Sequence, residues 1–307
     1  MKCSKLPNNY EDNIGNKMIN PKIISISLIT LFLFILFWGI SSFSQDTAKT
    51  ENEYIKASND SLKNKDTLSV TLPVRTNNAF TKGEKLVFDI SYGFVTAGRA
   101  YMEIPDYEQF KDRKCYRIEC RVNSLPFFST FFKVEDKYLS LVDVEGIFPW
   151  KFEQHIREGG YKRDFNAEFD HFNGKVITTK GTYNIQPFVF DIISAFYYTR
   201  TLDLGSMKPG NKIHLENFFK DTTHTLDVKF KGRQTIETDA GEFRCIIVEP
   251  IIKEGNLFKA EGSMLIWLTD DDRKIPIMVK SKVVVGSITV ELVEYSGING
   301  TIGAKVN

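Results

Sequence analysis

From about residue 80 onward, apolar and polar side chains alternate along the chain with a period of two. Residues 86–92 read LVFDISY, residues 116–122 YRIECRV and residues 226–230 LDVKF. Successive side chains of a strand point to opposite faces, so each segment predicts a half-buried strand. The pair Asn173-Gly174 lies between two such segments and favours a hairpin turn. About a dozen strands at hairpin spacing over residues 80–296 predict an antiparallel all-β domain.

One segment departs from this alternation. In residues 191–200, DIISAFYYTR, apolar side chains recur at helical spacing, and Asp191 stands where an N-cap is expected. A single apolar helix must bury its face against the sheet. A sheet of this width would leave two long edges if flat, so it curls or closes. The expected fold is mainly β, a strongly curved antiparallel sheet or open β-barrel with one central helix packed on the concave side.

The N-terminal region contains an uncharged apolar run, residues 23–40, preceded by Lys17 and Lys22 and followed by Ser42-Phe43-Ser44. These features predict either a cleaved signal peptide or a retained N-terminal membrane anchor. A start at Met18 instead of Met1 would give a leader of more typical length. No Cys directly follows the run, which argues against a lipoprotein anchor. In either case the chain is expected to be exported, to the periplasm or tethered to a membrane and facing the periplasm.

The chain divides into four predicted parts. Residues 1–45 form the signal peptide or anchor, residues 46–78 a disordered polar tether, residues 79–297 the β domain and residues 298–307 a tail. The formal net charge of the whole chain is +1, so no charge field attracts nucleic acid. Membrane contact is expected only through the N-terminal segment, if it is uncleaved.

Three cysteines follow the leader: Cys115, Cys120 and Cys245. Cys115 and Cys120 lie in one predicted strand on opposite faces, so they cannot bridge each other. Three buried thiols are expected, and the alternative is one disulfide from Cys245 to either of the others.

Motifs for catalysis are lacking. The sequence contains no Gly-x-Ser-x-Gly elbow, His-Glu-x-x-His helix, phosphate loop, dinucleotide fingerprint or Cys-x-x-Cys pair. His214 and His224 are expected to be surface imidazoles, because a metal site needs three or four converging ligands. Residues 270–272, three consecutive aspartates, lack the spacing and the Gly of a calcium loop and predict a charged turn. We therefore expect a protein that is not an enzyme and has no metal or cofactor.

Phenylalanine is in surplus: the chain has 25 Phe, and aromatic residues make up 13% of it. Four Phe fall within residues 127–132, more than one strand face can bury. Such a cluster indicates a ligand cavity or rim, aromatic packing of the core, or an exposed patch for a partner or membrane. Asp191 and Arg200 stand at the two ends of the helix. They are either a buried pair that lines the floor of a pocket, or an N-cap (Asp191) and a positive charge that stabilises the C-terminal end of the helix dipole (Arg200). The candidate ligand-lining residues are Phe127, Phe128, Phe131, Phe132, Trp150, Phe188, Phe196, Tyr197 and Arg200.

Three separated segments resemble a known family. Residues 80–92 with Ala97-Gly98, residues 191–200 and residues 267–276 (WLTDDDRKIP) are similar to the bacterial exported family known as domain of unknown function 3108. The resemblance covers residues 80–296. It implies export, a β-rich fold and a half-barrel shape similar to that of periplasmic lipoprotein carriers, and it carries no catalytic residues.

Three classes of function remain open. The first is an envelope protein that binds or carries a hydrophobic small molecule or lipid inside the curved sheet. The second is a structural or interaction protein that binds an envelope partner through an aromatic patch or a sheet edge. The third is a hydrolase that uses scattered Asp, Glu and His side chains.

Overall fold

The computed structural model describes residues 70–254, 257–258, 264–283 and 286–306. The predicted leader, residues 1–45, and the tether up to residue 69 lie outside the described residues. Of the helices in the described part of the chain, none has the length and apolar content needed to cross a membrane. The elements are β1 Lys85–Tyr92, β2 Val95–Glu103, β3 Tyr107–Phe110, β4 Arg113–Ser124, α4 Pro126–Ser129, β5 Glu135–Asp143, β6 Pro149–Glu158, β7 Tyr161–Asp170, β8 Lys175–Thr178, β9 Gly181–Asn184, α5 Ile192–Arg200, β10 Lys212–Phe219, β11 Thr222–Thr238, β12 Gly241–Glu254, β13 Leu257–Phe258, β14 Met264–Thr269, β15 Pro276–Lys282, β16 Ser287–Ser296 and β17 Lys305–Val306.

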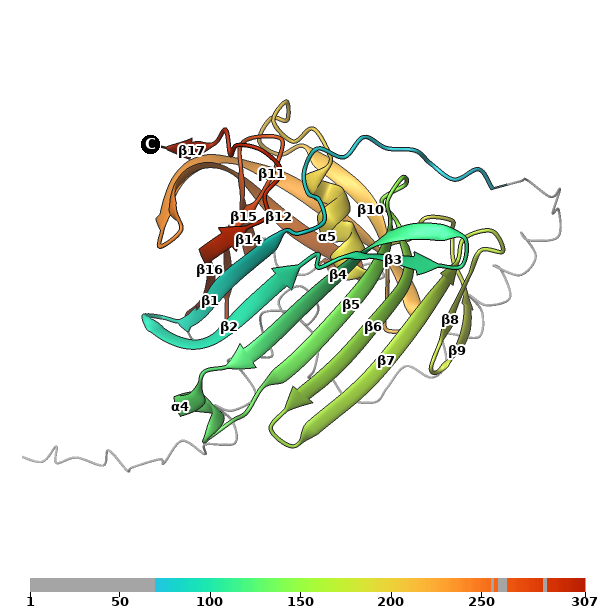
Figure 1. Ribbon diagram of the computed structural model, residues 1–307, viewed down its shortest axis with the longest axis horizontal. Coiled ribbons are helices and arrows are strands. Elements are labelled where there is room, and N and C mark those ends of the chain that lie inside the picture. The colour runs from blue at the N-terminus through green and yellow to red at the C-terminus, as the bar shows by residue number, and fades with distance from the viewer. Residues whose placement is uncertain (1–69, 255–256, 259–263, 284–285, 307) are drawn as a thin grey trace, which may run out of the picture.

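The described strands form one 17-stranded sheet, and neighbouring strands pair antiparallel (Figure 1). The two halves of the chain join where β1 pairs with both β2 and β16. On one side the sheet continues through β4, β5, β6 and β7 to β8 and β9. On the other side it continues through β15, β14, β12 and β11 to β10. The prediction of an antiparallel, strongly curved sheet is confirmed.

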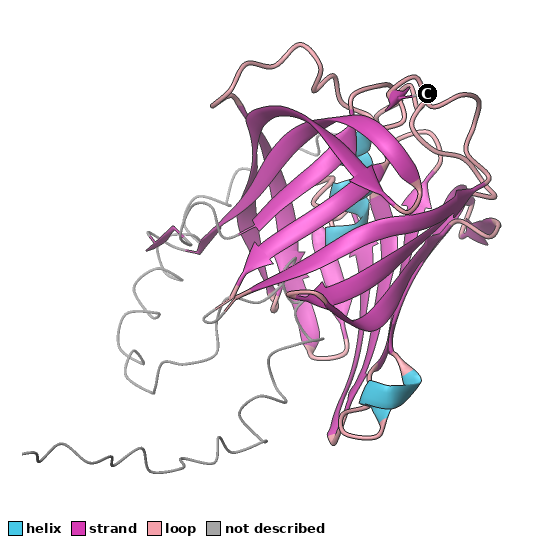
Figure 2. Cartoon of the chain, turned by 90° about the vertical axis from the view of Figure 1, so that its left-hand side faces the viewer, coloured by secondary structure: helices cyan, strands magenta, loops and turns pink. Residues whose placement is uncertain are grey.

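The two edge strands, β9 and β10, face each other without forming a ladder. The Tyr183 and Phe218 rings lie 5.9 Å apart between them, and Lys180 Nζ is 2.9 Å from the Asp221 carboxylate. The chain just before α5 makes a single parallel bridge to β10, from Phe190 to Asn217. The sheet therefore curves into an open barrel whose seam consists of side chains and one backbone bridge (Figure 2).

Helix α5 lies on the concave side of the sheet, as predicted (Figures 1 and 2). Asp191 is its N-cap and accepts hydrogen bonds from the backbone N–H of Ile193 and Ser194. The Ser140 hydroxyl of β5 donates to the same carboxylate at 2.7 Å, which fixes the start of the helix against the sheet. The helix ends at Arg200, beside the start of β1. We call this end of the barrel the helix end, and the opposite end, where α4 connects β4 to β5, the α4 end.

Ordered contacts extend beyond the predicted domain limits on both sides. Residues 70–78 belong to the predicted tether, yet Arg75 donates its backbone N–H to Glu145 and its guanidinium lies 4.7 Å from the Tyr198 ring centroid. In the predicted tail, β17 pairs with β12. Both segments close over the helix end.

Candidate functional site

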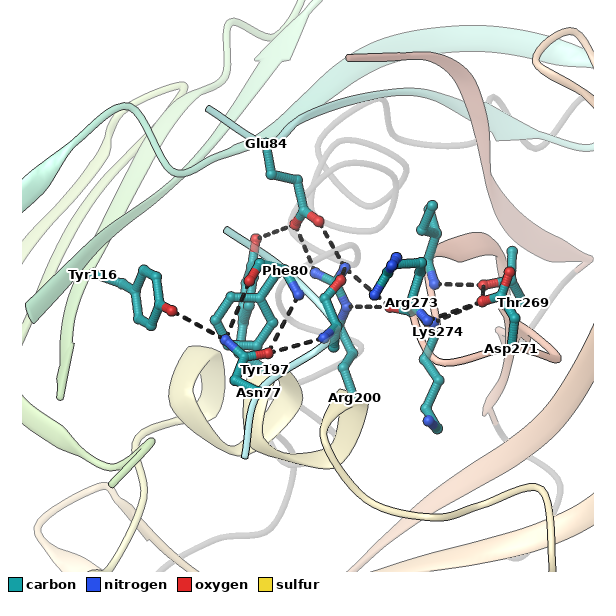
Figure 3. Close-up of polar contacts among 12 residues, drawn as sticks. Asn77, Phe80, Glu84, Tyr116, Tyr197, Arg200, Thr269, Asp271, Arg273 and Lys274 are labelled. Carbon is teal, nitrogen blue, oxygen red and sulfur yellow. Dashed lines mark hydrogen bonds and ion pairs between the residues drawn. The ribbon is translucent and has the colours of Figure 1, made fainter. Parts of the chain in front are cut away.

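A buried ion pair joins α5 to the segment before β1 (Figure 3). Arg200 Nη1 and Nη2 each lie 2.7 Å from one Glu84 carboxylate oxygen, a bidentate arrangement. The Arg200 and Glu84 side chains are 0% and 1% exposed. Full burial of a charged pair requires that its remaining donors also find acceptors.

The remaining Arg200 donors point to backbone carbonyls. Nη2 donates to Ala79 at 3.3 Å and to Arg273 at 3.2 Å, and Nε donates to Arg273 at 3.3 Å. The rings of Phe80 and Tyr197 lie against the guanidinium, with centroids 5.4 and 5.0 Å from Cζ. The cation is therefore held by carboxylate, carbonyl and aromatic groups together.

Three segments distant in sequence meet at this pair. Glu84 lies in residues 80–92, Arg200 in residues 191–200 and Arg273 in residues 267–276. Asp271 shapes the last segment, because its carboxylate accepts from the Arg273 N–H at 3.0 Å and from the Ala304 N–H at 3.0 Å (Figure 3). Since the pair is fully buried, the cluster joins these segments and offers no surface to a solute.

Sequence reasoning placed Arg200 correctly on the helix but missed its partner. The sequence alternatives were a pocket floor or a charge that stabilises the helix C-terminus. Glu84 gives no local signal, because it stands 116 positions before Arg200. The sequence signal that could have found it is the position of Glu84 directly before the apolar run of β1. A carboxylate buried at that point needs a positively charged partner.

Asp191 is buried at 1% exposure on the concave side. Burial raises its pKa to about 6, against the lowering effect of hydrogen bonds from Ser140, Ser194 and Ile193. The sequence assignment of Asp191 as N-cap is confirmed. The described contacts of Asp191 do not include Arg200, so the two residues that bracket α5 belong to separate interactions.

Toward the α4 end, further side chains of the sheet face inward. Their orientation follows from Ser140, which faces the helix, because residues two apart and directly paired residues share one face of the sheet. Most are buried and aliphatic. The series comprises Val122 of β4, Ala100 of β2, Ile90 of β1, Val290 of β16, Val279 of β15, Ile266 of β14 and Val248 of β12.

A few polar side chains interrupt this apolar face on β5 and β6. Tyr138 and Gln154 are paired in register and hydrogen-bonded to each other. Asp136 is hydrogen-bonded to the Glu158 side chain and accepts from the Arg157 backbone N–H at 2.8 Å. Burial raises the pKa of Asp136, against the lowering effect of the hydrogen bonds from Arg157 and Glu158. An apolar wall with a few grouped polar atoms is the composition of ligand sites.

The nine candidate lining residues fall into three places. Tyr197 and Arg200 belong to the buried ion-pair cluster, and the Phe196 ring lies beside Tyr197 at 5.9 Å. Trp150 and Phe188 lie at the helix end, and each ring is within 5.4 Å of the buried His171 ring. The remaining four, Phe127, Phe128, Phe131 and Phe132, lie on and just after α4. Their role in binding a ligand stays a prediction.

Two of the four phenylalanines on and after α4 are exposed to solvent. Phe127 is 69% exposed and Phe131 is 78% exposed, and α4 contains no buried residue. The Phe127 ring contacts Phe128 and Phe131 at centroid distances of 5.3 and 5.6 Å. Phe127 and Phe131 therefore form an exposed aromatic surface at the α4 end, whereas Phe128 and Phe132 are half-buried and Phe132 packs against the core.

The other residues with reactive side chains are buried thiols or hydrogen-bonded imidazoles. Cys115, Cys120 and Cys245 are free and buried, as expected. His214 Nδ1 is 2.5 Å from Asp227, and His224 Nε2 is 3.1 Å from the Phe219 carbonyl. Within the described residues, no group of three or more His, Cys, Asp or Glu side chains is placed to hold a metal ion. The Asp270–Asp272 run forms the turn between β14 and β15.

Comparison with known proteins gives a family and two distant structures. The family model described as protein of unknown function (DUF3108) matches residues 87–293. No curated protein matches the chain.

The beta-barrel-like protein of domain of unknown function DUF1849 from Brucella abortus shares 11% identity, with 73% of this chain and 98% of that chain covered and a TM-score of 0.44. A Bacteroides fragilis protein with a YmcC-like fold also shares 11% identity, with 74% and 100% covered and a TM-score of 0.27. Both TM-scores are low, and we take neither fold nor function of this chain from these proteins.

Proposed function

Since the chain belongs to the family described as protein of unknown function (DUF3108), which carries no assigned activity, we propose from its own geometry that it is a non-catalytic cell-envelope protein that binds a hydrophobic, lipid-like ligand. The ligand lies inside the open barrel, between the N-terminal end of α5 and the α4 end.

One observation carries this proposal: α5 covers the concave face at the helix end, while most inward-facing side chains toward the α4 end are aliphatic. Val122, Ala100 and Ile90 illustrate this face. An acyl chain that binds against such groups gains free energy from its own apolar surface, at about 25 cal/mol per Å² removed from water. Tyr138 with Gln154, and Asp136 with Glu158, supply polar groups that would orient a headgroup.

Export is the second part of the proposal and is supported by the N-terminal sequence. The apolar run of residues 23–40, the preceding Lys17 and Lys22, and Ser42-Phe43-Ser44 are typical of a secretory signal or an anchor. Either one places the β domain where lipids cross between membranes.

The test is native mass spectrometry of protein purified from its own host, followed by organic extraction. We expect a co-purified lipid with the wild-type chain and its loss in Ala100→Trp, whose new ring fills the concave face. Lys137→Trp is the matched control, because Lys137 is exposed on β5 next to Asp136 but on the outer face. Val122→Phe is a second, smaller inward substitution in case Ala100→Trp does not fold.

A wild-type protein that carries no lipid would contradict the proposal. So would a lipid that remains in folded Ala100→Trp and Val122→Phe to the same extent as in Lys137→Trp, because the ligand would then bind elsewhere.

A further inference from the structure

The α4 end of the barrel exposes large aromatic side chains from three neighbouring connections. Phe94 in the β1–β2 turn is 99% exposed, and Tyr161 after the β6–β7 turn is 54% exposed. Phe127 and Phe131 of the β4–β5 connection, already described, lie between them. Isolated exposed apolar residues are common in proteins, but four of the five strongly exposed aromatic side chains among the described residues lie at this end, and such a group indicates an interaction surface.

Backbone hydrogen bonds show that these connections are adjacent. Leu125 donates its N–H to the Ala97 carbonyl at 2.9 Å, which joins the β1–β2 hairpin to the segment before α4. Gly159 donates its N–H to the Lys133 carbonyl at 2.8 Å, which joins the β6–β7 turn to the segment after α4. A Cβ at Gly159 would lie 2.7 Å from the Phe132 ring, so the two segments are in tight contact. We call residues 92–97, 125–134 and 159–163 the aromatic rim.

The aromatic rim contains basic residues only, and the acidic residues Glu135, Glu158 and Asp164 border it. Its charged residues are Lys133, Lys162 and Arg163, and it contains no Asp or Glu. Lys133 is paired with Glu135 just outside the rim, at 2.8 Å, whereas Lys162 is exposed. Protruding aromatic rings beside basic side chains are the combination that binds the interface of anionic bilayers, because rings enter the headgroup region and cations attract acidic lipids.

From this charge and this arrangement we infer that the aromatic rim docks on the surface of an anionic lipid bilayer, with the rings of Phe94, Phe127 and Phe131 inserted at the headgroup level. The rings protrude from separate connections at one end of the barrel. A fluid bilayer accommodates such separate rings because it needs no surface of complementary shape. This contact adds to the predicted N-terminal segment and faces the same end of the barrel as the proposed ligand.

The experiment introduces a tryptophan into the purified full chain as Phe131→Trp and measures its emission with vesicles of phosphatidylethanolamine and phosphatidylglycerol whose acyl chains are brominated. Phe172→Trp is the matched control, because Phe172 is 56% exposed but follows β7 at the helix end. The wild-type spectrum, from Trp38, Trp150 and Trp267, is subtracted from both. The difference spectrum reports only the introduced tryptophan, so membrane binding by residues 23–40, seen through Trp38, does not contribute to it.

We expect the emission of the tryptophan at position 131 to shift to the blue and lose intensity with brominated lipid, and that at position 172 to do neither. Phosphatidylcholine vesicles, or Lys162→Glu in the same background, should weaken the quenching. Phe94→Ser or Phe127→Ser should weaken it by about tenfold in lipid concentration, as expected for one exposed ring removed.

Equal quenching at positions 131 and 172 would overturn the inference. Cross-linking in the host provides the second outcome. An envelope protein captured by the wild-type chain but not by Phe127→Ser, together with no lipid quenching at position 131, would overturn the inference in favour of a protein partner. The inference does not rest on the proposed ligand, since lipid extraction and rim quenching are separate measurements and either can fail alone.

Discussion

Arg200 at the end of α5 and Glu84 directly before β1 form a bidentate ion pair at 2.7 Å for both contacts, with neither side chain accessible to water. The pair connects the central helix to the strand at which the two halves of the sheet join. Because Arg200 also donates to the carbonyls of Ala79 and Arg273, one side chain holds three segments in place.

Removal of either charge should therefore destabilise the fold strongly. Arg200→Met leaves the Glu84 carboxylate buried without a cation, and Glu84→Leu leaves the guanidinium without its anion. We expect each variant to lose about 3–5 kcal/mol of unfolding free energy, measured by urea denaturation.

The double variant, Glu84→Leu with Arg200→Met, is the control. It leaves no unpaired charge, so its loss should be smaller than the sum of the two single losses. Additive losses would show that the two side chains are not coupled.

The sequence predicted much of this architecture because its signals are local. Strand alternation, the Asn173-Gly174 turn and the N-cap at Asp191 each depend on neighbouring residues, and the curvature follows from the number of strands. The pairs Glu84–Arg200 and Asp136–Glu158 were missed. Alternation shows which face a side chain occupies, but not which distant side chain it meets there.

For the phenylalanine cluster, the sequence showed that the residues are unusual but not where they lie in the structure. Composition indicated an unusual aromatic group at residues 127–132, but the pattern could not decide between a cavity, the core and an exposed patch. The deciding feature is α4, a four-residue helix that starts at Pro126 and turns Phe127 and Phe131 to solvent.

Asp191 should make stability depend on pH. Its folded pKa of about 6 lies above the ordinary value of 3.8, so between these pH values the folded chain holds more protons than the unfolded chain. Asp191 therefore adds its full stabilising contribution to the unfolding free energy below pH 3.8. This contribution, about 3 kcal/mol in total, is lost as the pH rises through about 6. Asp191→Asn keeps an acceptor for the helix N–H groups and should remove this dependence, measured as unfolding free energy against pH. An unchanged pH profile would contradict this assignment.

His171 should make the unfolding free energy depend on pH in the opposite direction, so that stability increases as the pH rises. Phe188 donates its N–H to Nδ1 at 3.0 Å, and Nε2 lies 2.6 Å from the Pro149 carbonyl, so the ring is neutral with its hydrogen on Nε2. Burial lowers its pKa to about 4 from 6.5. Neutral His171 therefore adds its full stabilising contribution to the unfolding free energy above pH 6.5, and this contribution is lost as the pH falls through about 4.

His171→Phe should remove that dependence and cost about 1–3 kcal/mol near neutral pH, because the Phe188 N–H loses its acceptor. The same titration of unfolding free energy checks both variants. If His171→Phe and Asp191→Asn changed the slope with the same sign, one of the two pKa directions would be wrong.

The three thiols of the β domain should be unreactive in the folded state. Burial raises the pKa of Cys115 and of Cys245 to about 12, and Cys120 is buried on the concave face. Thiolate is the reactive form, so a thiol reagent should label these residues only as the chain unfolds in urea. Rapid labelling of any of them in buffer, mapped by peptide mass, would show that the strand concerned opens.

Substitutions in the aromatic rim should leave stability almost unchanged. Phe127→Ser and Phe131→Ser remove rings that are 69% and 78% exposed, so we expect the unfolding free energy to stay within about 0.5 kcal/mol of wild type. Phe80→Ala, at 2% exposure and against Arg200, should cost about 3–5 kcal/mol in the same urea titration. A large loss in the rim variants would mean that the rings support the fold. The expected result instead leaves these exposed rings without a role in folding, and an interaction surface then accounts for their presence.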